Sequence, residues 1–387
     1  MGSADPAFGG PLESILRQND VAEYSIRELL TLDAPDAGFI ADLPLRTHAI
    51  GATPRVASGP VSSILSRYRF TPALHRWLLA HGREYDVIIV NGLWNYAAMG
   101  ASLVLPGLGV PYFVVSHGMM SAYFKKNYPL KHAAKQISWL FGEGRLLHHA
   151  RSVLFATETE RTLARRQYWG WSYNEEVVGS GTVEPPPADP TALAALRAQI
   201  RLSDGQAYLL FMGRLHRVKG CDLLLQAFAQ SAGMDPNVVL VMAGPDESGW
   251  RGELEALAQA LQISERIRWT GMLSGQFKWA ALRGAAALVL PSHQENFGMV
   301  VAEALACATP VLISDKVNIW REIEQDGAGL VAPDTKEGIA SLLERFLTSS
   351  VAEKEQMRAA ARRCFLDRFD LRRVGRRLQE VLAACCR

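Results

Sequence analysis

The sequence predicts an α/β protein built from two parallel, doubly wound sheets, and three observations support this expectation. Short apolar runs of strand length alternate with segments of helical pattern through most of the 387 residues. Both halves of the chain repeat this alternation, and each half carries its own glycine-bearing loops. A stretch rich in glycine and proline, 179–190, lies between the halves and is typical of a linker.

In the first half, a helix is expected after the turn Gly9-Gly10-Pro11, because proline favours the first turn of a helix. No apolar run precedes this turn. The first strand of the sheet is therefore expected to be missing, which leaves a neighbouring strand edge exposed. Later apolar runs predict strands at 28–32, 46–50, 86–90, 111–115 and 152–156. Helices are expected at 71–81, within 91–105 after a loop, and after 157–160.

The length predicts two or three domains, and we place the first at 1–183 and the second at 205–366. Residues 184–204 are expected to link them and to include a helix at 191–200. Strands of the second domain are predicted at 207–212, 238–243, 267–270, 286–290 and 310–314. Its helices are predicted at 222–230, 253–261, 277–283, around 304–308, and at 335–347 and 352–365, and a last helix, 371–385, follows the domain.

Composition excludes some classes of function. The net charge of +2 gives no reason to expect nucleic acid as a partner. No apolar run reaches the ~18 residues of a membrane span, and no signal peptide is visible. The five scattered cysteines lack a C-x-x-C pair, so a reduced, cytosolic protein without structural zinc is expected. No Asp-x-Asp occurs, which gives no indication of a carboxylate-held metal.

The strongest chemical signal lies in 293–303, a loop and helix start that follow the predicted strand 286–290. Phe297 and Gly298 would place free N–H groups at the helix start, where the dipole favours an anion. Glu295 in the loop can accept hydrogen bonds from hydroxyl groups. Together these features indicate a sugar nucleotide. The alternative, that Glu295 and Glu303 are ordinary surface carboxylates, stays open on this stretch alone.

Two cations follow another predicted strand of the same sheet. Arg214 and Lys219 lie five positions apart just past 207–212, and such a pair can neutralise a diphosphate. A solvated basic loop is the commoner explanation of such a pair. Parallel strands, however, place their carboxyl ends on one edge, so we expect this loop to converge with Glu295 and Glu303.

A basic and aromatic segment lies between His117 and Arg151. It is either a helix with a solvated basic side or a contact with anionic lipid or a lipid-diphosphate acceptor through 123–151. His117 itself follows a predicted strand, where a lone histidine is more often structural. Glu158 at the next helix start is most simply a capping residue.

These motifs resemble those of the retaining glycosyltransferases of family 4, which have the GT-B fold of two Rossmann-like domains facing across a cleft. The resemblance covers almost the full length. In the second domain it rests on Gly213-Arg214 with Lys219-Gly220, Gly244-Pro245, the pair Glu295 and Glu303, and 326–331. In the first domain, Gly9-Gly10-Pro11 and 116–119 look like the family's diphosphate loop and the loop facing the donor sugar.

The resemblance implies a role for each site residue. Arg214 and Lys219 would bind the diphosphate and stabilise it as a leaving group, and Glu303 would hold the ribose. Glu295 would bind hydroxyls of the donor sugar, and His117 would touch that sugar near the reacting centre. The remaining donor contacts are expected from backbone at Gly9, Gly10, Gly213, Gly244, Asn296, Phe297, Gly298 and Met299. Residues 367–387 would cross back to the first domain as a helix.

The resemblance therefore implies a retaining, metal-independent hexosyltransferase without a cofactor. Its donor would be a UDP- or GDP-sugar, and its acceptor a glycan or a lipid-linked molecule in surface polysaccharide biosynthesis. The expected location is cytoplasmic, peripheral at the inner face of the cell membrane. The alternatives are an epimerase or phosphorylase of the same fold, and a non-catalytic sugar-binding protein. Donor base, sugar, acceptor, linkage and oligomeric state are left open.

Overall fold

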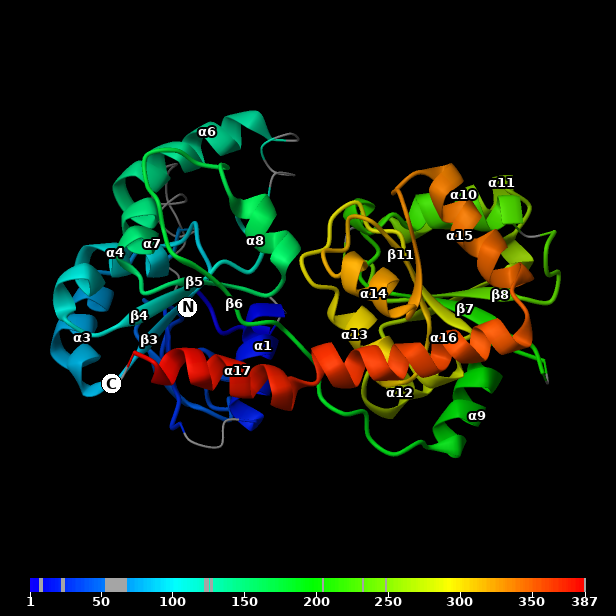
Figure 1. Cartoon of the computed structure of the whole chain (residues 1–387), viewed down its shortest axis with the longest axis horizontal. Helices are drawn as coiled ribbons and strands as arrows, with labels where there is room; N and C mark the ends of the chain where they lie inside the picture. The colour runs from blue at the N-terminus through cyan, green and yellow to red at the C-terminus, as the bar shows by residue number, and fades with distance from the viewer. Residues whose placement is uncertain are drawn as a thin grey trace. The chain divides into compact units, whose positions relative to one another are not determined.

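The computed structural model describes residues 1–6, 10–21, 25–52, 68–121, 125, 128–203, 205–231, 233–247 and 249–385. The chain divides into two units (Figure 1). Unit 1 comprises Met1–Ser180 with Leu371–Arg387, and unit 2 comprises Gly181–Asp370. Residues 184–204, predicted as a linker, thus belong to unit 2.

Unit 2 is built on one parallel sheet of six strands in the order β12-β11-β10-β7-β8-β9. The strands are β7 (Tyr208–Met212), β8 (Val239–Ala243), β9 (Ile267–Gly271), β10 (Ala287–Leu290), β11 (Val311–Ser314) and β12 (Gly329–Ala332). The chain runs outward from β7 through β8 to β9. It then returns to the other side of β7 and runs outward again from β10 to β12.

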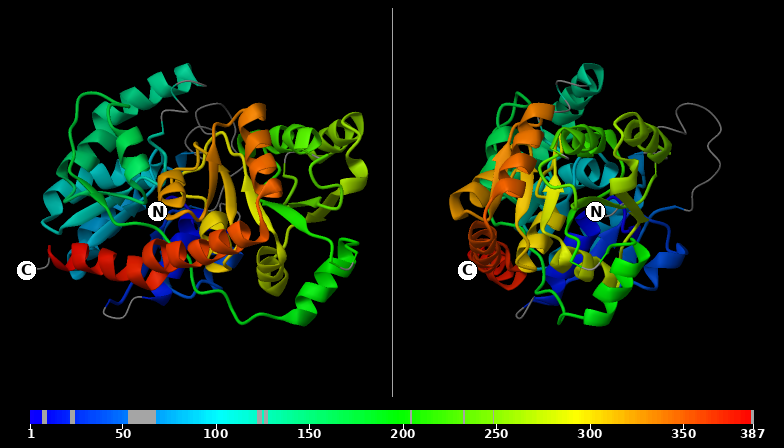
Figure 2. Two further views of the ribbon diagram at one scale, coloured as in Figure 1. Left: turned by 45° about the vertical axis from the view of Figure 1, so that its right-hand side comes forward. Right: turned by 90° about the vertical axis from the view of Figure 1, so that its right-hand side faces the viewer.

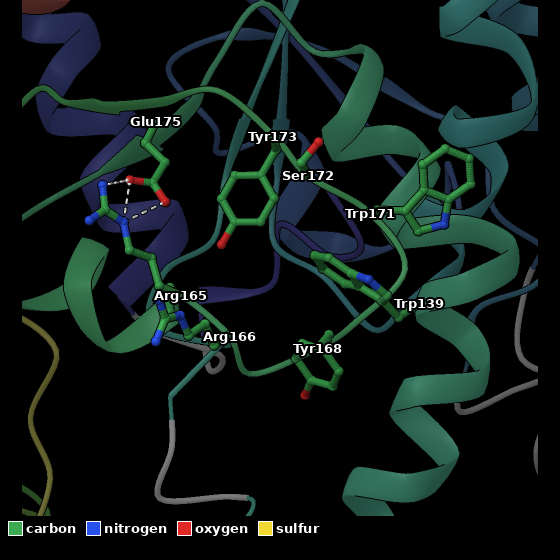
Figure 3. A pocket seen from close by; sticks show the side chains of 9 residues that line it. Trp139, Arg165, Arg166, Tyr168, Trp171, Ser172, Tyr173 and Glu175 are labelled. Atoms are coloured by element: carbon green, nitrogen blue, oxygen red, sulfur yellow. Dashed lines mark hydrogen bonds and ion pairs between the residues drawn. The ribbon is translucent and has the colours of Figure 1, made fainter.

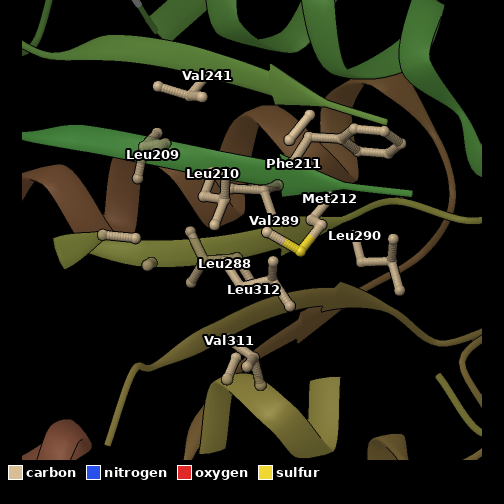
Figure 4. Close-up of a cluster of buried hydrophobic side chains, with 14 of the residues drawn as sticks. Leu209, Leu210, Phe211, Met212, Val241, Leu288, Val289, Leu290, Val311 and Leu312 are labelled. Carbon is tan, nitrogen blue, oxygen red and sulfur yellow. The ribbon is translucent and has the colours of Figure 1, made fainter. Parts of the chain in front are cut away.

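The central strands of this sheet are buried on both faces, as expected for parallel strands covered by helices (Figure 4). Every residue of β7, β8, β10 and β11 is buried. Their apolar side chains, among them Leu210, Leu288 and Leu312, form the core of unit 2. Such continuous apolar runs are why these strands could be predicted from the sequence.

Helices cover both faces of the six-stranded sheet (Figures 1 and 2). On one face α10 (Cys221–Ser231) packs against α11 (Arg251–Ala260) and α15 (Lys336–Thr348). On the other, α12 (Gly275–Gly284) packs against α9 (Pro190–Gln199) and α13 (Met299–Ala306). Here α16 (Val351–Cys364) contacts α13 and α14 (Trp320–Asp326), and it continues into the π-helical turn η7 (Phe365–Phe369).

Unit 1 contains two parallel sheets. One pairs β1 (Glu28–Thr31) with β2 (Arg46–Ala49). The other has the order β3-β4-β5-β6, with β3 (Ile88–Asn91), β4 (Tyr112–Val115), β5 (Val153–Phe155) and β6 (Glu175–Val177). In the part of the chain that the structure describes, no strand precedes α1 (Gly10–Asp20). Beside β1, the Met1 ammonium donates to the Leu30 carbonyl at 2.7 Å.

Six helices in the described part of unit 1, besides α1, surround its four-stranded sheet or pack on the helices that cover it. They are α3 (Ala73–His81), α4 (Tyr96–Leu108), α6 (Pro129–Ser138), α7 (Gly144–His149), α8 (Glu158–Ala164) and α17 (Leu371–Ala383). The π-helical turn η4 (Trp139–Glu143) joins α6 to α7. Leu378 and Leu382 of α17 pack against Phe113 of β4 and Leu154 of β5. Among the described residues, no helix is both long and apolar enough to cross a bilayer.

Candidate functional site

The chain reverses the direction in which it crosses the sheet of unit 2 between β7 and β10. These neighbours are parallel, and their onward connections run to opposite edges of the sheet. The loops that follow them, 213–220 and 291–298, therefore leave the same edge of the sheet side by side, before the chain continues from each in opposite directions. A crevice at this kind of switch point is where open α/β sheets bind ligands.

The two loops are held together by an ion pair between Lys219 and Glu295. Lys219 ends the short 3₁₀-helix η5 (Arg217–Lys219), and its Nζ donates to the Glu295 carboxylate. Both side chains are about one-fifth exposed, so the pair is shielded but reachable. The backbone supports it, since the amide of His293 donates to the Val218 carbonyl at 2.8 Å. The predicted convergence of the two loops is thus observed.

Glycine at two positions allows the backbone to pack closely here. Gly220 has φ of +67°, and a Cβ added to it would lie 2.4 Å from the Pro291 carbonyl oxygen. Gly244, at the end of β8, has φ of +149°, and a Cβ there would lie 1.8 Å from the Gly213 carbonyl oxygen. Only glycine fits either position without moving the neighbouring backbone.

Arg214 lies on the open side of the same edge. Its side chain is 60% exposed and pairs with Glu247 at 3.2 Å, rather than with Glu295. Such an exposed pair is weak, because water screens both charges. Arg214 is therefore free to change partner at little cost in energy.

The Glu295 loop is fixed by its neighbour along the sheet edge. The Glu295 amide donates to the Lys316 carbonyl, and its own carbonyl accepts from the Asn318 amide, both at 3.0 Å. Asn318 also donates to the Asn296 side chain at 3.4 Å. Phe297 is buried edge-on against Phe369, with ring centroids 5.6 Å apart.

Helix α13 starts directly after this loop. Gly298 precedes it with φ of +78°, and no described side chain caps its first turn. The first N–H groups of α13 therefore remain available to an anion. Met299, the first residue of α13, is half-buried beside them.

Glu303, in the second turn of α13, is buried and paired. Lys278 of α12 donates to it at 2.9 Å, and the Glu303 side chain is only 6% exposed. The structure thus places Glu303 beside α12, in an ion pair that the sequence analysis did not anticipate. Lys278 belongs to no recognisable sequence motif. Its pairing with Glu303 therefore could not be predicted from the sequence.

In unit 1, His117 follows β4 at a tight turn. Its φ is +47° and that of Gly118 is +74°, so the chain turns through the left-handed region. Nε2 of His117 donates to Oδ1 of Asn91 at 2.9 Å. Burial lowers the pKa of His117 to about 4, so the imidazole is neutral at physiological pH.

Glu160 holds the His117 turn from α8. Its Oε1 accepts from the Ser116 hydroxyl at 2.8 Å and from the Gly118 amide at 2.7 Å, and its Oε2 accepts from the Ala156 amide at 2.8 Å. The capping residue expected at this helix start is Glu158, and no role was expected for Glu160. The signal was present, because Thr157 and Glu160 have the spacing of a capping box, and the Glu160 amide does donate to Thr157 Oγ1 at 2.9 Å.

The glycine loop of unit 1 is described only in part. Gly9 lies outside the described residues. Gly10 is the first residue of α1 and is exposed, and a Cβ there would meet nothing within 4 Å. Local packing therefore gives no requirement for glycine at position 10.

Two family models match the chain on either side of the boundary between the units. "Glycosyl transferase 4-like domain" matches residues 22–181, and "Glycosyl transferases group 1" matches residues 194–363. The D-inositol 3-phosphate glycosyltransferase of Frankia alni is 31% identical over 296 residues, which cover 72% of this chain and 70% of that protein. The chain belongs to the group 1 glycosyltransferases.

The GT-B fold of this family is confirmed by solved structures. HepE from Anabaena, solved in complex with UDP, matches 99% of this chain and 98% of its own with a TM-score of 0.78 at 18% identity. At that identity the likeness concerns the fold alone. A second relative, the D-inositol 3-phosphate glycosyltransferase of Segniliparus rotundus, is 28% identical over 303 residues, which cover 76% of this chain. The chain spans 64% of the length of that relative.

Proposed function

We propose that this group 1 glycosyltransferase moves a hexose from a nucleotide diphosphate sugar to a hydroxyl group of a glycan or lipid-linked acceptor. The observation that carries the proposal is the Lys219–Glu295 pair at the switch point of unit 2. It puts a cation for the diphosphate and a carboxylate for sugar hydroxyls in contact. The UDP bound by HepE supports a uridine donor, and a GDP-sugar is the alternative.

The diphosphate is proposed to lie between Lys219, Arg214 and the first N–H groups of α13. These groups supply positive charge where the leaving group develops negative charge, which stabilises the transition state. Glu303 is proposed to accept from the ribose hydroxyls, sharing its carboxylate with Lys278. Glycine at 213 and 244, and Asn296, Phe297 and Met299 at the helix start, line this position.

We infer a retaining reaction on one face of the sugar. The bond from C1 to the phosphate oxygen breaks as the acceptor oxygen bonds to C1 from the same side, and the departing diphosphate takes the acceptor proton. Glu295 orients the sugar and is not the nucleophile. Neutral His117 is proposed to contact the sugar from unit 1, without acting as an acid.

The test is a transfer assay with UDP- and GDP-hexoses and with D-inositol 3-phosphate, the acceptor named for the relatives, among the acceptors. Retained configuration at C1 of the product, seen by NMR, supports the proposal. Full activity in the presence of EDTA supports metal independence. Donor hydrolysis with no acceptor product, or phosphate-dependent cleavage, would point instead to an epimerase or phosphorylase. Binding of free sugar without nucleotide would favour a sugar-binding protein.

We further propose that α6 and η4 touch the anionic inner face of a membrane, which fits a lipid-linked acceptor in surface polysaccharide assembly. Leu130, Ile137 and Phe141 are exposed by 86%, 63% and 72%, and they recur at spacings of seven and four on one side of the helix. Lysines at 125, 131 and 135 accompany them. Of the predicted segment 123–151, Tyr123, Phe124 and Lys126 lie outside the described residues.

Vesicle co-sedimentation tests the membrane proposal. Wild type should bind vesicles with anionic lipid and not zwitterionic ones, and Leu130→Glu with Ile137→Glu should abolish this. Val351→Glu, at an equally exposed apolar residue of unit 2, is the control. Equal sedimentation of all three proteins would refute the membrane contact.

A further inference from the structure

Unit 1 contains a pocket of about 250 Å³ between the continuous helix formed by α6, η4 and α7 and the loop that follows α8 (Figure 3). Its aromatic lining is Trp139, Tyr168, Trp171 and Tyr173. Arg165 and Arg166 lie across the pocket from the two tryptophans. Clefts that hold drug-sized ligands measure ~300–1,000 Å³, so this one suits a single ring.

The aromatic wall is fixed in place before any ligand arrives. Tyr168 stacks on Trp139 with centroids 5.0 Å apart, and it also stacks on His132 at 4.8 Å. The Trp171 indole donates to the Leu140 carbonyl at 3.1 Å. Trp171 and Tyr173 are partly exposed, and the electron-rich faces of such rings attract the C–H groups on one side of a sugar or cyclitol ring.

Of the two arginines that line the pocket, Arg165 is paired within the protein, whereas Arg166 is available to bind a ligand. Arg165 donates to Glu175 at 2.6 and 2.8 Å, and Glu175 also accepts from Arg161. Arg166 has no hydrogen bond or ion pair within the described part of the chain. It is exposed and has φ of +60°, a left-handed conformation that residues other than glycine rarely adopt. An exposed guanidinium without a partner can bind a phosphate or carboxylate with two hydrogen bonds.

The pocket adjoins the His117 turn. Tyr168 lies 5.0 Å from the ring of Trp94, which follows β3, and the Trp94 indole donates to the Met119 carbonyl at 3.1 Å. Met119 is two residues from His117, and the same α8 carries Glu160 at its start and Arg165 and Arg166 just past its end. The aromatic wall of the pocket is thus connected to the His117 turn by packing through Trp94 within unit 1.

We propose that this pocket binds the acceptor, by stacking one sugar or cyclitol ring on the aromatic wall and holding its phosphate or carboxylate group with Arg166. Only the ligand's role as the acceptor rests on the proposed function. The binding of an anionic ring follows from the pocket itself. The ring phosphate can belong to a soluble molecule or to a lipid headgroup, and the chemistry of the pocket is the same for both.

Direct binding tests the pocket without requiring transfer. Glucose 6-phosphate, glucose and inorganic phosphate are titrated separately, with tryptophan fluorescence as the readout. Wild type should bind glucose 6-phosphate about tenfold more tightly than either of the others, because both the ring and the charge contribute. Arg166→Gln removes the positive charge and shortens the side chain but keeps a polar end, and it should lower the affinity for glucose 6-phosphate to that for glucose.

The control is Arg373→Gln on α17, which packs on Phe113 and Leu154 rather than on the pocket. Arg373 is exposed and, like Arg166, has no partner in the described residues. The control should bind like wild type. Tyr168→Leu should weaken glucose 6-phosphate and glucose alike, with a melting curve to verify folding. Equal binding by wild type and Arg166→Gln, or an equal loss in Arg373→Gln, overturns the proposal.

Phosphatidylinositol vesicles added as a competitor distinguish a lipid headgroup from a soluble molecule as the ligand of the pocket. Displacement of glucose 6-phosphate by these vesicles, and not by phosphatidylcholine vesicles, assigns a lipid-borne acceptor. Absence of displacement assigns a soluble one. Binding of UDP to unit 2 is measured in parallel. If Arg166-dependent binding is found without UDP binding or transfer, the pocket stands and the proposed function fails.

Discussion

At the residue scale, the charged groups of the candidate site are paired with one another. Lys219 holds Glu295, Lys278 holds Glu303, and Arg214 holds Glu247. In the proposed reaction, a diphosphate at Lys219 competes with the Glu295 carboxylate, which then becomes available to the sugar hydroxyls. The Lys219–Glu295 and Lys278–Glu303 pairs also compensate charges in largely buried positions, where an unpaired charge would be destabilising.

Glu295→Gln tests the orienting role of this carboxylate. The amide keeps the shape and can still bond hydroxyls, but it cannot balance Lys219. We expect the donor KM to rise about tenfold, with a smaller fall in kcat, as for a lost binding contact. Glu253→Gln, which removes an exposed pair with Arg217, is the control and should change neither. A glycosyl group trapped on Glu295 of the wild type would contradict the role.

The lowered pKa of His117 leads us to expect that the stability of the protein depends on pH. Its pKa falls from the ordinary value of 6.5 to about 4 in the folded protein. Between these values the unfolded chain binds more protons, so the free energy of unfolding decreases as pH falls. His117→Gln should remove on the order of 2 kcal/mol of this loss between about pH 7 and about pH 4.5. Urea unfolding at both pH values measures it, and parallel losses in both proteins would refute it.

At the element scale, the site depends on loops that leave adjacent strands and press against each other. The β7 and β8 ends meet at Gly213 and Gly244, and the η5 turn meets Pro291 at Gly220. The first helical turn of α13 is left open for a ligand. In unit 1, one carboxylate, Glu160, fixes the turn around His117. In each case backbone shape decides where the functional side chain lies.

Gly244→Ala should disrupt the edge that carries Arg214. The added Cβ collides with the Gly213 carbonyl at a φ of +149°, so both backbone segments must shift. We expect unfolding free energy to fall by about 2–4 kcal/mol. Gly252→Ala in α11, where a Cβ meets nothing within 4 Å, is the matched control and should be neutral or slightly stabilising. Similar denaturation curves for the two variants would show that the close approach is unimportant.

At the scale of the whole molecule, the sequence was sufficient for the two α/β halves and for most of their strands. Continuous apolar runs such as 208–212 and 287–290 predict buried parallel strands, and both strands are observed. The convergence of Lys219 with Glu295 was also predictable, because strand order places both loops at one edge. The family expected from these motifs is confirmed.

Other features could not be predicted because they depend on packing between distant segments. The short strand β6 contains two glutamates and lacks an apolar run. The partner of Glu303 is set by how α12 lies beside α13, which no local pattern encodes. The same holds for the pocket at Tyr168, whose wall combines residues from 139 to 175.

The most direct test of the central claim is a thermal-shift measurement with UDP, GDP and ADP. A nucleoside diphosphate that binds between the loops 213–220 and 291–299 stabilises the native state by about 2.7 kcal/mol at a concentration of about 100 Kd, which raises the melting temperature by several degrees. Lys219→Ala should lose this shift, whereas Lys354→Ala, which removes a bond to the Leu347 carbonyl and a cation–π contact with Phe346 on α15, should keep it. A shift of equal size in all three proteins, or none with any nucleotide, would contradict a diphosphate site at Lys219.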